Sequence, residues 1–341
     1  MKTLITEHWA GQVRGAGRND MTRVVPLVRL VRPDLRTLFE RTYPAFADRC
    51  RAVDEPGVAV VAVDELTGNA MGMACLRARV DRHVTAIVGR HDKCDLYLAG
   101  NDRLALRQLA IVLAPVSDWR AGTSTVSYRM LDLRTTESMI DEDGRPLRGL
   151  RSEGAAMVRC GGYAIFALPL GDPTDWPASA SDAWSFMPER VYHDELARVP
   201  DASIVRELVP PRAHITRVTR TAGPRDTGMP LVSCRDVAGR LLLRGSWGSG
   251  AIDVGHQALR DGVLLGRYAR CDGGLGLSGD SSLSRVHALL LLVDERLLAI
   301  DVASTNGTHA VGQADARVIE LAGETELELG GTTYARWSWS S

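Results

Sequence analysis

Short apolar runs separated by turn residues mark two stretches of the chain. In the first stretch the runs lie at 58–63, 71–79, 84–88, 95–98 and 110–113, with a turn at Thr67-Gly68-Asn69 between the first two. The same pattern returns further along the chain, at 231–235, 241–245, 262–266, 288–293, 297–302, 316–321, 326–329 and 333–337. Runs of about four to eight apolar residues between turn residues are typical of β-strands. Many short strands at this spacing predict a mainly β fold with two β-sandwiches rather than βαβ units.

The remaining segments lack this pattern. After Pro33, large apolar residues recur at the spacing of an amphipathic helix, namely Leu35, Leu38, Phe39, Tyr43 and Phe46. Residues 173–228 are rich in proline and contain one plausible helix, near 189–198, so we interpret them as a connector. The expected domains are a partly helical N-terminal extension (1–55), a first sandwich (56–172), the Pro-rich connector (173–228) and a second sandwich (229–339).

The composition adds few constraints. The chain has 341 residues, of which 45% are hydrophobic and 24% charged, and its formal net charge is -1. These values are those of an ordinary soluble protein with room for two domains, and they give no reason to expect nucleic acid as a partner. Residues 1–20 contain no apolar signal sequence, and runs such as 288–293 are far shorter than the ~20 residues of a membrane helix. We expect a cytoplasmic protein with no membrane insertion.

The sequence offers no metal or catalytic motif. The cysteines are scattered, without a Cys-x-x-Cys pair or a histidine at zinc-binding spacing. The common signatures of hydrolases, P-loop enzymes, zinc proteases and kinases are missing. Asp201, Ser203 and His214 form a triad only on paper, because they lie in the connector and lack a rigid scaffold. We therefore expect no catalytic residues, no cofactor and no metal.

The two stretches of short strands resemble each other in sequence. Each opens with a hairpin-like segment, continues with a Gly-Arg pair, at 89–90 and 266–267, and then has a Cys-Asp pair, at 94–95 and 271–272. Repeated motifs at matching positions indicate an internal duplication. We therefore interpret the two sandwiches as copies of one domain.

Three segments of the second copy carry the functional signal. They read LLGRYARCD (264–272), SLSRVHALL (282–290) and DVASTNGTHAVG (301–312). Each is weak alone, because a Gly-Arg or Asn-Gly-Thr often marks only a strand end or a turn. In this order and spacing, the three together resemble the forkhead-associated (FHA) domain family. The resemblance implies FHA-type β-sandwiches, the second of which binds a phosphothreonine in a partner protein.

On this resemblance, five residues form the phosphothreonine site. Arg267 pairs with the phosphate, Ser284 donates its hydroxyl to a phosphate oxygen, and Arg285 lines the same pocket. Thr305 lies beside the phosphate, and Asn306 binds the backbone of the ligand. These residue types suit the ligand, because a phosphothreonine carries about -1.5 to -2 charges and three strong acceptor oxygens.

The resemblance also implies residues that support the binding loops, namely Gly266, His287, Gly307 and Thr308. A lone histidine between strand residues lacks the partners that a catalytic or metal-binding role requires. Gly307 supplies the backbone dihedral of a tight turn, and Thr308 can tie that turn to the next strand. The segment 309–312 departs from the family pattern, so we expect the loop beside the pocket to differ.

The first copy is expected to be degenerate. The arginine, serine, histidine and asparagine of the second pocket align with Arg90, Leu106, Leu109 and Glu137. A carboxylate repels an incoming phosphate, so an internal ion pair between Arg90 and Glu137 is the favoured interpretation. Binding of an unmodified protein surface is the functional alternative. An insertion at 117–125, which includes Trp119, is a further candidate contact loop.

These observations predict a bacterial adaptor without catalytic activity that docks on a threonine-phosphorylated protein, downstream of a Ser/Thr protein kinase. The first sandwich would hold another protein or form a homo-oligomer. The alternative is a phosphate-independent scaffold of a multiprotein assembly, such as a secretion or defence complex. Binding of a phosphopeptide distinguishes the two classes.

Overall fold

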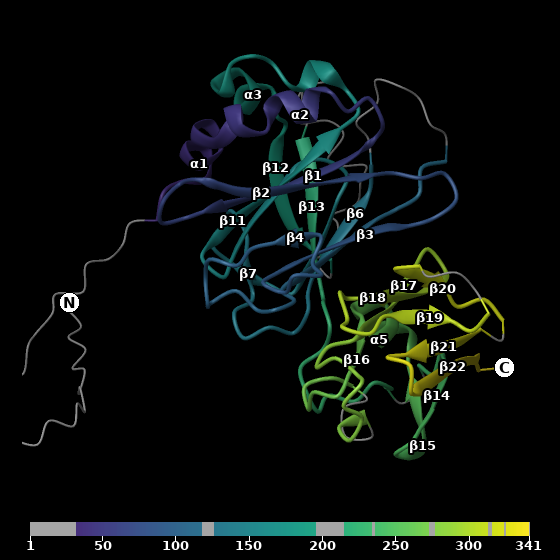
Figure 1. The fold of residues 1–341 in the computed structure, drawn as a ribbon. Helices are drawn as coiled ribbons and strands as arrows, with labels where there is room; N and C mark the ends of the chain where they lie inside the picture. The colour runs from purple at the N-terminus through teal and green to yellow at the C-terminus, as the bar shows by residue number, and fades with distance from the viewer. Residues whose placement is uncertain are drawn as a thin grey trace, which may run out of the picture. The chain divides into compact units, whose positions relative to one another are not determined.

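The fold consists mainly of β-strands, with a few short helices (Figure 1). The computed structural model describes residues 32–117, 126–195, 215–233, 236–272, 277–312, 316–323 and 325–340. The prediction of a mainly β fold with a short helical N-terminal region is confirmed. Residues 34–341 form one compact unit. Most of the candidate contact loop at 117–125, namely residues 118–125 with Trp119, lies outside the described residues.

The N-terminal helices follow from capping and from apolar spacing. Helix α1 (Leu35–Thr42) begins after Asp34, whose carboxylate accepts the Thr37 backbone N–H at 2.7 Å. A 3-10 helix, η1 (Tyr43–Ala45), and α2 (Ala47–Arg51) continue the segment. The apolar side of these helices is buried, and the rings of Phe39 and Phe166 lie 5.9 Å apart at their centroids. The helices therefore cover the outer face of a sheet.

The first sandwich is built from two sheets. One has the order β2-β1-β11-β10-β7-β8 and contains β1 (Gly57–Asp64), β2 (Ala70–Arg77), β7 (Met139–Ile140), β8 (Pro146–Leu147), β10 (Ala156–Cys160) and β11 (Tyr163–Leu170). The other has the order β12-β13-β9-β6-β5-β3-β4 and contains β3 (Val84–Gly89), β4 (Leu96–Tyr97), β5 (Leu109–Leu113), β6 (Tyr128–Asp132), β9 (Gly149–Ser152), β12 (Glu189–Asp194) and β13 (Ile215–Thr221).

The sequence of strand β1 is apolar at nearly every position, and its two faces explain why. Val58 and Val60 point into the core between the two sheets, whereas Ala59 and Val61 point to the other face. That face packs against the N-terminal helices and α3 (Ala180–Phe186). A strand covered on both faces needs apolar residues at every position, because successive side chains alternate in direction.

The second sandwich also has two sheets. The order β15-β14-β22-β21-β19 joins β14 (Gly239–Gly245), β15 (Gly248–Val254), β19 (Thr308–Ala310), β21 (Glu326–Leu329) and β22 (Thr333–Trp339). The order β16-β17-β18-β20 joins β16 (Val263–Leu265), β17 (Ala288–Val293), β18 (Arg296–Asp301) and β20 (Val318–Glu320). The short helix α5 (His256–Asp261) precedes β16.

The two sandwiches share one strand order. The arrangement β2-β1-β11-β10-β7 corresponds to β15-β14-β22-β21-β19, and β3-β5-β6-β9 corresponds to β16-β17-β18-β20. The strand register agrees as well, because Ile87 pairs with Ala110 as Leu264 pairs with Leu289. The sequence similarity between the two stretches therefore reflects a shared topology.

The structure corrects the interpretation of the segment that follows the first sandwich. The helix predicted near 189–198 is wrong, since Glu189–Asp194 forms strand β12, which runs parallel to β13. Strand β13 in turn pairs with β9, so both strands extend a sheet of the first sandwich. Pairing with strand β13 determines the conformation of this segment, and the spacing of apolar residues within the segment does not predict such long-range pairing. Residues 196–214, with Asp201, Ser203 and His214, lie outside the described residues.

The two sandwiches pack against each other through sheet faces. On β5, Leu109 and Ile111 point into their own core, whereas Ala110 and Val112 join an apolar cluster shared by both sandwiches. We call this cluster the interface cluster; its other buried members are Ile87, Cys94, Leu131, Leu133, Leu264, Cys271, Leu289, Leu291, Leu298, Ile300, Val302 and Ala303. An apolar interface of this kind favours a fixed arrangement over a loose tether.

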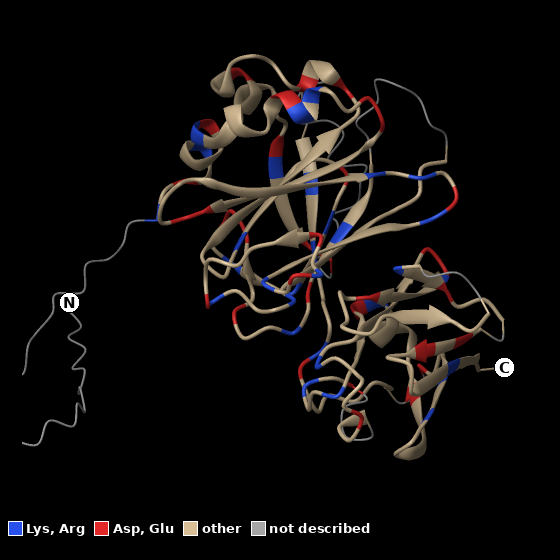
Figure 2. Ribbon diagram, viewed as in Figure 1, with Lys and Arg blue, Asp and Glu red and all other residues tan. Residues whose placement is uncertain are grey.

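Charges of both signs are spread over the two sandwiches. Figure 2 shows segments of Lys and Arg interspersed with segments of Asp and Glu, in keeping with the net charge of -1. Within the described residues, no helix is both long enough and apolar enough to cross a membrane.

Candidate functional site

Three loops of the second sandwich meet at one end of a sheet. Arg267 follows β16, Ser284 and Arg285 precede β17, and Thr305 and Asn306 follow β18. Because β16, β17 and β18 are antiparallel neighbours, the end of β16, the start of β17 and the end of β18 lie at the same edge. The structure thus brings the five predicted phosphothreonine-binding residues together. We call these five residues the candidate site.

Arg267 presents an exposed guanidinium at this edge. Its Nε donates to the Leu283 carbonyl at 2.8 Å, which fixes the base of the guanidinium. Among the described residues, no carboxylate forms an ion pair with Arg267. The positive charge is therefore accessible to a ligand.

Ser284 and Thr305 form the polar floor of the candidate site. The Ser284 hydroxyl accepts the backbone N–H of Thr305 at 2.8 Å and lies 3.2 Å from the Thr305 hydroxyl. Ser284 is only 6% exposed, whereas Thr305 is exposed. The pair joins the loop before β17 to the loop after β18.

Asn306 and Arg285 lie at the rim. The Asn306 amide nitrogen donates to the Ser282 carbonyl at 2.8 Å, which orients the side chain across the two loops. Arg285 is exposed, and its carbonyl accepts the backbone N–H of Tyr268 at 3.0 Å. The candidate site therefore combines two exposed guanidinium groups with hydroxyl and amide donors. Within the described residues, no cluster of His, Cys, Asp or Glu could hold a metal ion.

The turn after β18 is held by Asp301. Its carboxylate accepts the Ser304 backbone N–H at 2.8 Å and the Thr308 hydroxyl at 2.9 Å. The turn places Ala303 at φ 60° and Gly307 at φ 84°, both in the left-handed region. Such a backbone persists only where side chains hold it, and it clusters at binding sites. Thr308 thus supports the loop through Asp301.

Gly266 permits the close approach of the first two loops. A Cβ at this position would lie 2.4 Å from the Arg285 carbonyl oxygen, which is part of the backbone and cannot rotate away. The position therefore requires glycine for the approach of β16 to the loop before β17.

His287 links the loops from below. It is fully buried; its Nδ1 accepts the Ser284 backbone N–H at 3.1 Å, and its Nε2 lies 2.8 Å from the Gly307 carbonyl. This pattern assigns the proton to Nε2 and a neutral imidazole. Burial lowers the pKa of His287 below its ordinary value, although the Gly307 carbonyl partly opposes the shift. The imidazole contacts backbone groups of both loops, as a structural residue would.

We expect the His287 side chain to make the stability depend on pH. Its pKa is depressed in the folded protein, so the unfolded chain takes up a proton first as the pH falls. The free energy of unfolding should decrease as the pH falls below about 6.5, the ordinary histidine value. In His287→Gln, which keeps one acceptor and one donor, this decrease should be smaller. Urea unfolding at pH 7 and pH 5 measures this decrease in the wild type and in His287→Gln. Equal decreases in the two proteins would contradict the assignment of a neutral, buried imidazole at His287.

The first sandwich has the same loop framework with other residues in it. In the first sandwich the backbone N–H of Arg90 donates to the Ala105 carbonyl. In the second, the backbone N–H of Arg267, at the matching position, donates to the Ser284 carbonyl. Ala105 therefore stands at the position of Ser284, and the sequence alignment that placed Leu106 there is wrong by one residue. The error arises because the loop of the second sandwich is two residues longer, which a Gly-Arg anchor alone does not reveal.

The same shift replaces Leu109 with Gln108 at the histidine position. Gln108 accepts the Ala105 backbone N–H at 3.0 Å and donates to the Glu137 carbonyl at 3.0 Å. Leu109 instead points into the core of the first sandwich. A neutral amide thus takes the structural place of the imidazole, without its titration.

The predicted ion pair between Arg90 and Glu137 is also wrong. Arg90 lies 3.4 Å from a carboxylate oxygen of Asp102, whereas Glu137 pairs with Arg103 at 3.0 Å. Glu137 does occupy the position of Asn306, because the turn after Asp132 repeats the turn after Asp301. With a carboxylate beside the arginine and no serine hydroxyl, this end of the first sandwich is a poor phosphate site.

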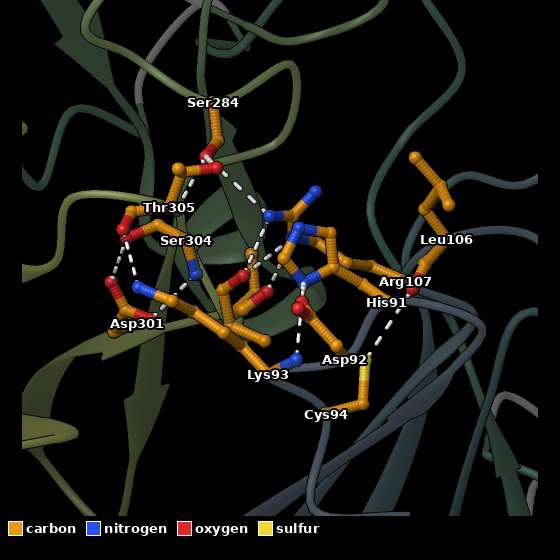
Figure 3. A network of polar contacts seen from close by, with 12 residues as sticks. His91, Asp92, Lys93, Cys94, Leu106, Arg107, Ser284, Asp301, Ser304 and Thr305 are labelled. Carbon is orange, nitrogen blue, oxygen red and sulfur yellow. Dashed lines mark hydrogen bonds and ion pairs between the residues drawn. The ribbon is translucent and has the colours of Figure 1, made fainter. Parts of the chain in front are cut away.

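The structure adds two residues that the sequence did not indicate. Arg107 and Lys93 belong to the first sandwich, yet they contact the loops of the candidate site (Figure 3). Arg107 donates to the Ala303 carbonyl at 2.6 Å, and Lys93 donates to the Thr305 carbonyl. No sequence signal marks either residue, because a contact between positions about two hundred residues apart depends on how the sandwiches pack.

Residues 263–330 match the model of the FHA domain family. The matched segment runs from β16 to the end of β21 and contains the whole candidate site with its supporting glycines, histidine and threonine. The resemblance predicted from the three motifs is thereby confirmed for the second sandwich. No curated protein matches the chain significantly.

Several solved FHA structures are similar to this chain at low identity. The FHA-1 domain of Mycobacterium tuberculosis Rv1747 is 22% identical, with 30% of this chain and 99% of that chain covered and a TM-score of 0.24. The FHA domain of CT664 from Chlamydia trachomatis is 21% identical, with 30% and 99% covered and a TM-score of 0.25. Mycobacterium tuberculosis EmbR, in complex with a low-affinity phosphopeptide, is 17% identical, with 30% and 25% covered and a TM-score of 0.25. At these scores the likenesses carry no argument about the ligand.

Proposed function

We propose that the second sandwich binds a phosphothreonine of a partner protein at the candidate site. The observation that carries this proposal is the exposed Arg267 guanidinium, which has no carboxylate partner among the described residues and lies at the same edge as Ser284 and Thr305. A phosphate monoester needs a charge-assisted donor together with neutral donors, and this edge supplies both kinds. The FHA domain match over 263–330 supports the same class of ligand.

The rim residues suit a peptide rather than a free phosphate. Asn306 is exposed and is already held in place by the Ser282 carbonyl, so its amide oxygen can accept a hydrogen bond from a ligand backbone. Arg285 extends the positive surface next to Arg267. The bound group is therefore a phosphorylated residue within an extended chain.

The protein as a whole then acts as a non-catalytic, cytoplasmic adaptor in Ser/Thr kinase signalling. Phosphorylation of the partner by the kinase creates the ligand, and the second sandwich binds the phosphorylated residue. The first sandwich is then a second FHA-type copy that does not bind phosphate, because Ala105 has no side-chain hydroxyl and the Asp102 carboxylate, 3.4 Å from Arg90, would repel a phosphate. Its exposed loops hold another protein or a second copy of the chain.

A library of peptides with a fixed phosphothreonine and varied neighbours tests the proposal with the full-length protein. We expect retention of phosphothreonine peptides and no retention of the same library with unmodified threonine. Equal retention of both libraries would reject phosphate recognition. Light scattering that shows assembly without any peptide would then favour the phosphate-independent scaffold.

A further inference from the structure

Arg107 is a buried charged residue at the interface between the sandwiches. It belongs to the loop before β5 of the first sandwich and is 7% exposed. Its Nε donates to the Val302 carbonyl at 2.8 Å, and its terminal nitrogen donates to the Ala303 carbonyl at 2.6 Å. The same terminal nitrogen lies 3.4 Å from the Ser284 hydroxyl of the candidate site (Figure 3). A guanidinium of the first sandwich thus lies next to Ser284, in the polar floor of the candidate site.

The charge of Arg107 has no carboxylate partner in the described part of the chain. Its recorded partners are two carbonyls and one hydroxyl, which are neutral. Burial lowers the pKa of Arg107 below its ordinary value, although an arginine remains charged in proteins. Asp92 and Asp301 act on the Arg107 charge electrostatically, but neither carboxylate forms an ion pair with it. A buried cation without a directly paired carboxylate is costly, and a dianion at the phosphate site would offset part of that cost.

Arg107 also determines how Ser284 can act. A serine hydroxyl has one proton and two acceptor lone pairs. One lone pair accepts the Thr305 backbone N–H at 2.8 Å, and the other faces the Arg107 nitrogen at 3.4 Å. The proton must then be donated, and its present partner is the Thr305 hydroxyl at 3.2 Å. A phosphate oxygen can replace that weak contact, so Arg107 prepares Ser284 as a donor.

A second contact from the first sandwich fixes the neighbouring loop. Lys93 donates to the carbonyl of Thr305, two residues beyond the strained Ala303. Arg107 binds the carbonyls that flank this strained position. The loop that carries Thr305 and Asn306 is therefore held at two points by the first sandwich, and the interface cluster keeps the two sandwiches in this arrangement.

We propose that Arg107 is a positioning residue of the phosphothreonine site, which orients Ser284 and adds positive charge, so that the site is complete only when the two sandwiches are paired. This inference rests on the proposed function of the second sandwich. It gives the degenerate first sandwich a task other than binding phosphate itself: it supplies part of the phosphate site of its neighbour.

The test compares variants of the full-length protein in titrations with one phosphothreonine peptide from the library. Arg107→Gln should weaken binding about tenfold, as loss of a charged hydrogen-bond partner does. The matched control is Arg129→Gln. Arg129 also belongs to the first sandwich and donates to a carbonyl of the second, that of Arg260 at 2.8 Å, but in the described part of the chain it makes no hydrogen bond or ion pair with the candidate site. The control should bind the peptide as the wild type does.

A second measurement separates a role at the phosphate from a role in folding. The second pKa of the bound phosphate, about 6 when free, is followed by phosphorus NMR as the pH is varied. A nearby guanidinium lowers this pKa, so Arg107→Gln should raise it and Arg107→Lys, which keeps the charge, should not. The wild type, Arg107→Gln and Arg107→Lys share all other charged or titratable groups around position 107, so a change in the phosphate pKa reports on this position alone. These groups are His91, Asp92, Lys93, Cys94, Arg285, His287 and Asp301.

The possible outcomes are distinct. Weaker binding together with a raised phosphate pKa in Arg107→Gln supports the inference. Unchanged binding and an unchanged phosphate pKa overturn it, and tighter binding overturns it too, because the arginine would then compete with the ligand. If the wild type binds no phosphopeptide, or if Arg267→Ala binds as well as the wild type, the proposed function fails, which is a separate result. If Arg107→Gln does not fold, Arg107→Lys decides through the titration. Weaker binding supports the inference, because a lysine cannot reproduce the guanidinium contacts with the Ala303 carbonyl and the Ser284 hydroxyl, and binding equal to that of the wild type overturns it.

Discussion

Replacing Arg267 with alanine should weaken the binding of a phosphothreonine peptide by about 2 to 5 kcal/mol, which is roughly 30-fold to several thousand-fold in Kd. The loss is large because this guanidinium is an exposed charge without a carboxylate partner among the described residues, at the edge where the Ser284 hydroxyl and the Asn306 amide lie. Titration calorimetry with the full-length protein gives the difference in Kd directly.

The fold should survive this change, because Arg267 is exposed and, among the described residues, its side chain hydrogen-bonds only to the Leu283 carbonyl. An unchanged thermal midpoint would show that only the site was altered. Arg90→Ala is the matched control, since Arg90 holds the same position in the first sandwich and makes the same contact, with the Leu104 carbonyl. Its binding should equal that of the wild type. A loss of less than threefold in Arg267→Ala would remove the basis of the proposed site.

The candidate site could be predicted from sequence because its residues belong to local motifs. Arg267 follows a glycine, Ser284 stands three positions before His287, and Thr305 and Asn306 precede a glycine turn. Each motif lies at a strand end, so the order of strands alone brings the loops together. Local pattern and topology agree here, which is the situation in which sequence reasoning succeeds.

The parts that sequence reasoning missed all depend on contacts between distant segments. Strand β12 has no local strand pattern as clear as that of β1, and it exists because β13 pairs with it. The role of Gln108 could not be recognised, because a loop shorter by two residues shifted the alignment and placed Leu109 in its position. No local pattern distinguishes Arg107 from the other arginines, because its burial depends on the packing of the two sandwiches.

The packing of the sandwiches depends on a second buried arginine, Arg134. Its guanidinium contacts Asp272 across the interface, with nitrogen to oxygen distances of 2.9 and 3.1 Å, and the two side chains are 5% and 7% exposed. Asp272 also accepts the Leu264 backbone N–H at 2.8 Å. Burial raises the pKa of Asp272, while Arg134 opposes that shift. The carboxylate therefore depends on the arginine to remain charged in this position.

Arg134→Met should accordingly lower the free energy of unfolding by about 3 to 5 kcal/mol at neutral pH, because it leaves a buried carboxylate unpaired. The difference in free energy of unfolding between the variant and the wild type should shrink as the pH falls. The pKa of Asp272, already raised by burial, rises further without Arg134. The folded variant therefore binds a proton at a higher pH than the unfolded chain does, which stabilises the folded state. Arg134→Met combined with Asp272→Asn should recover most of the loss, because the amide still accepts the Leu264 N–H without a charge. Urea unfolding at pH 7 and pH 5 measures all three proteins. A deficit below about 1 kcal/mol in the single variant would show that water reaches this pair as it reaches a surface salt bridge.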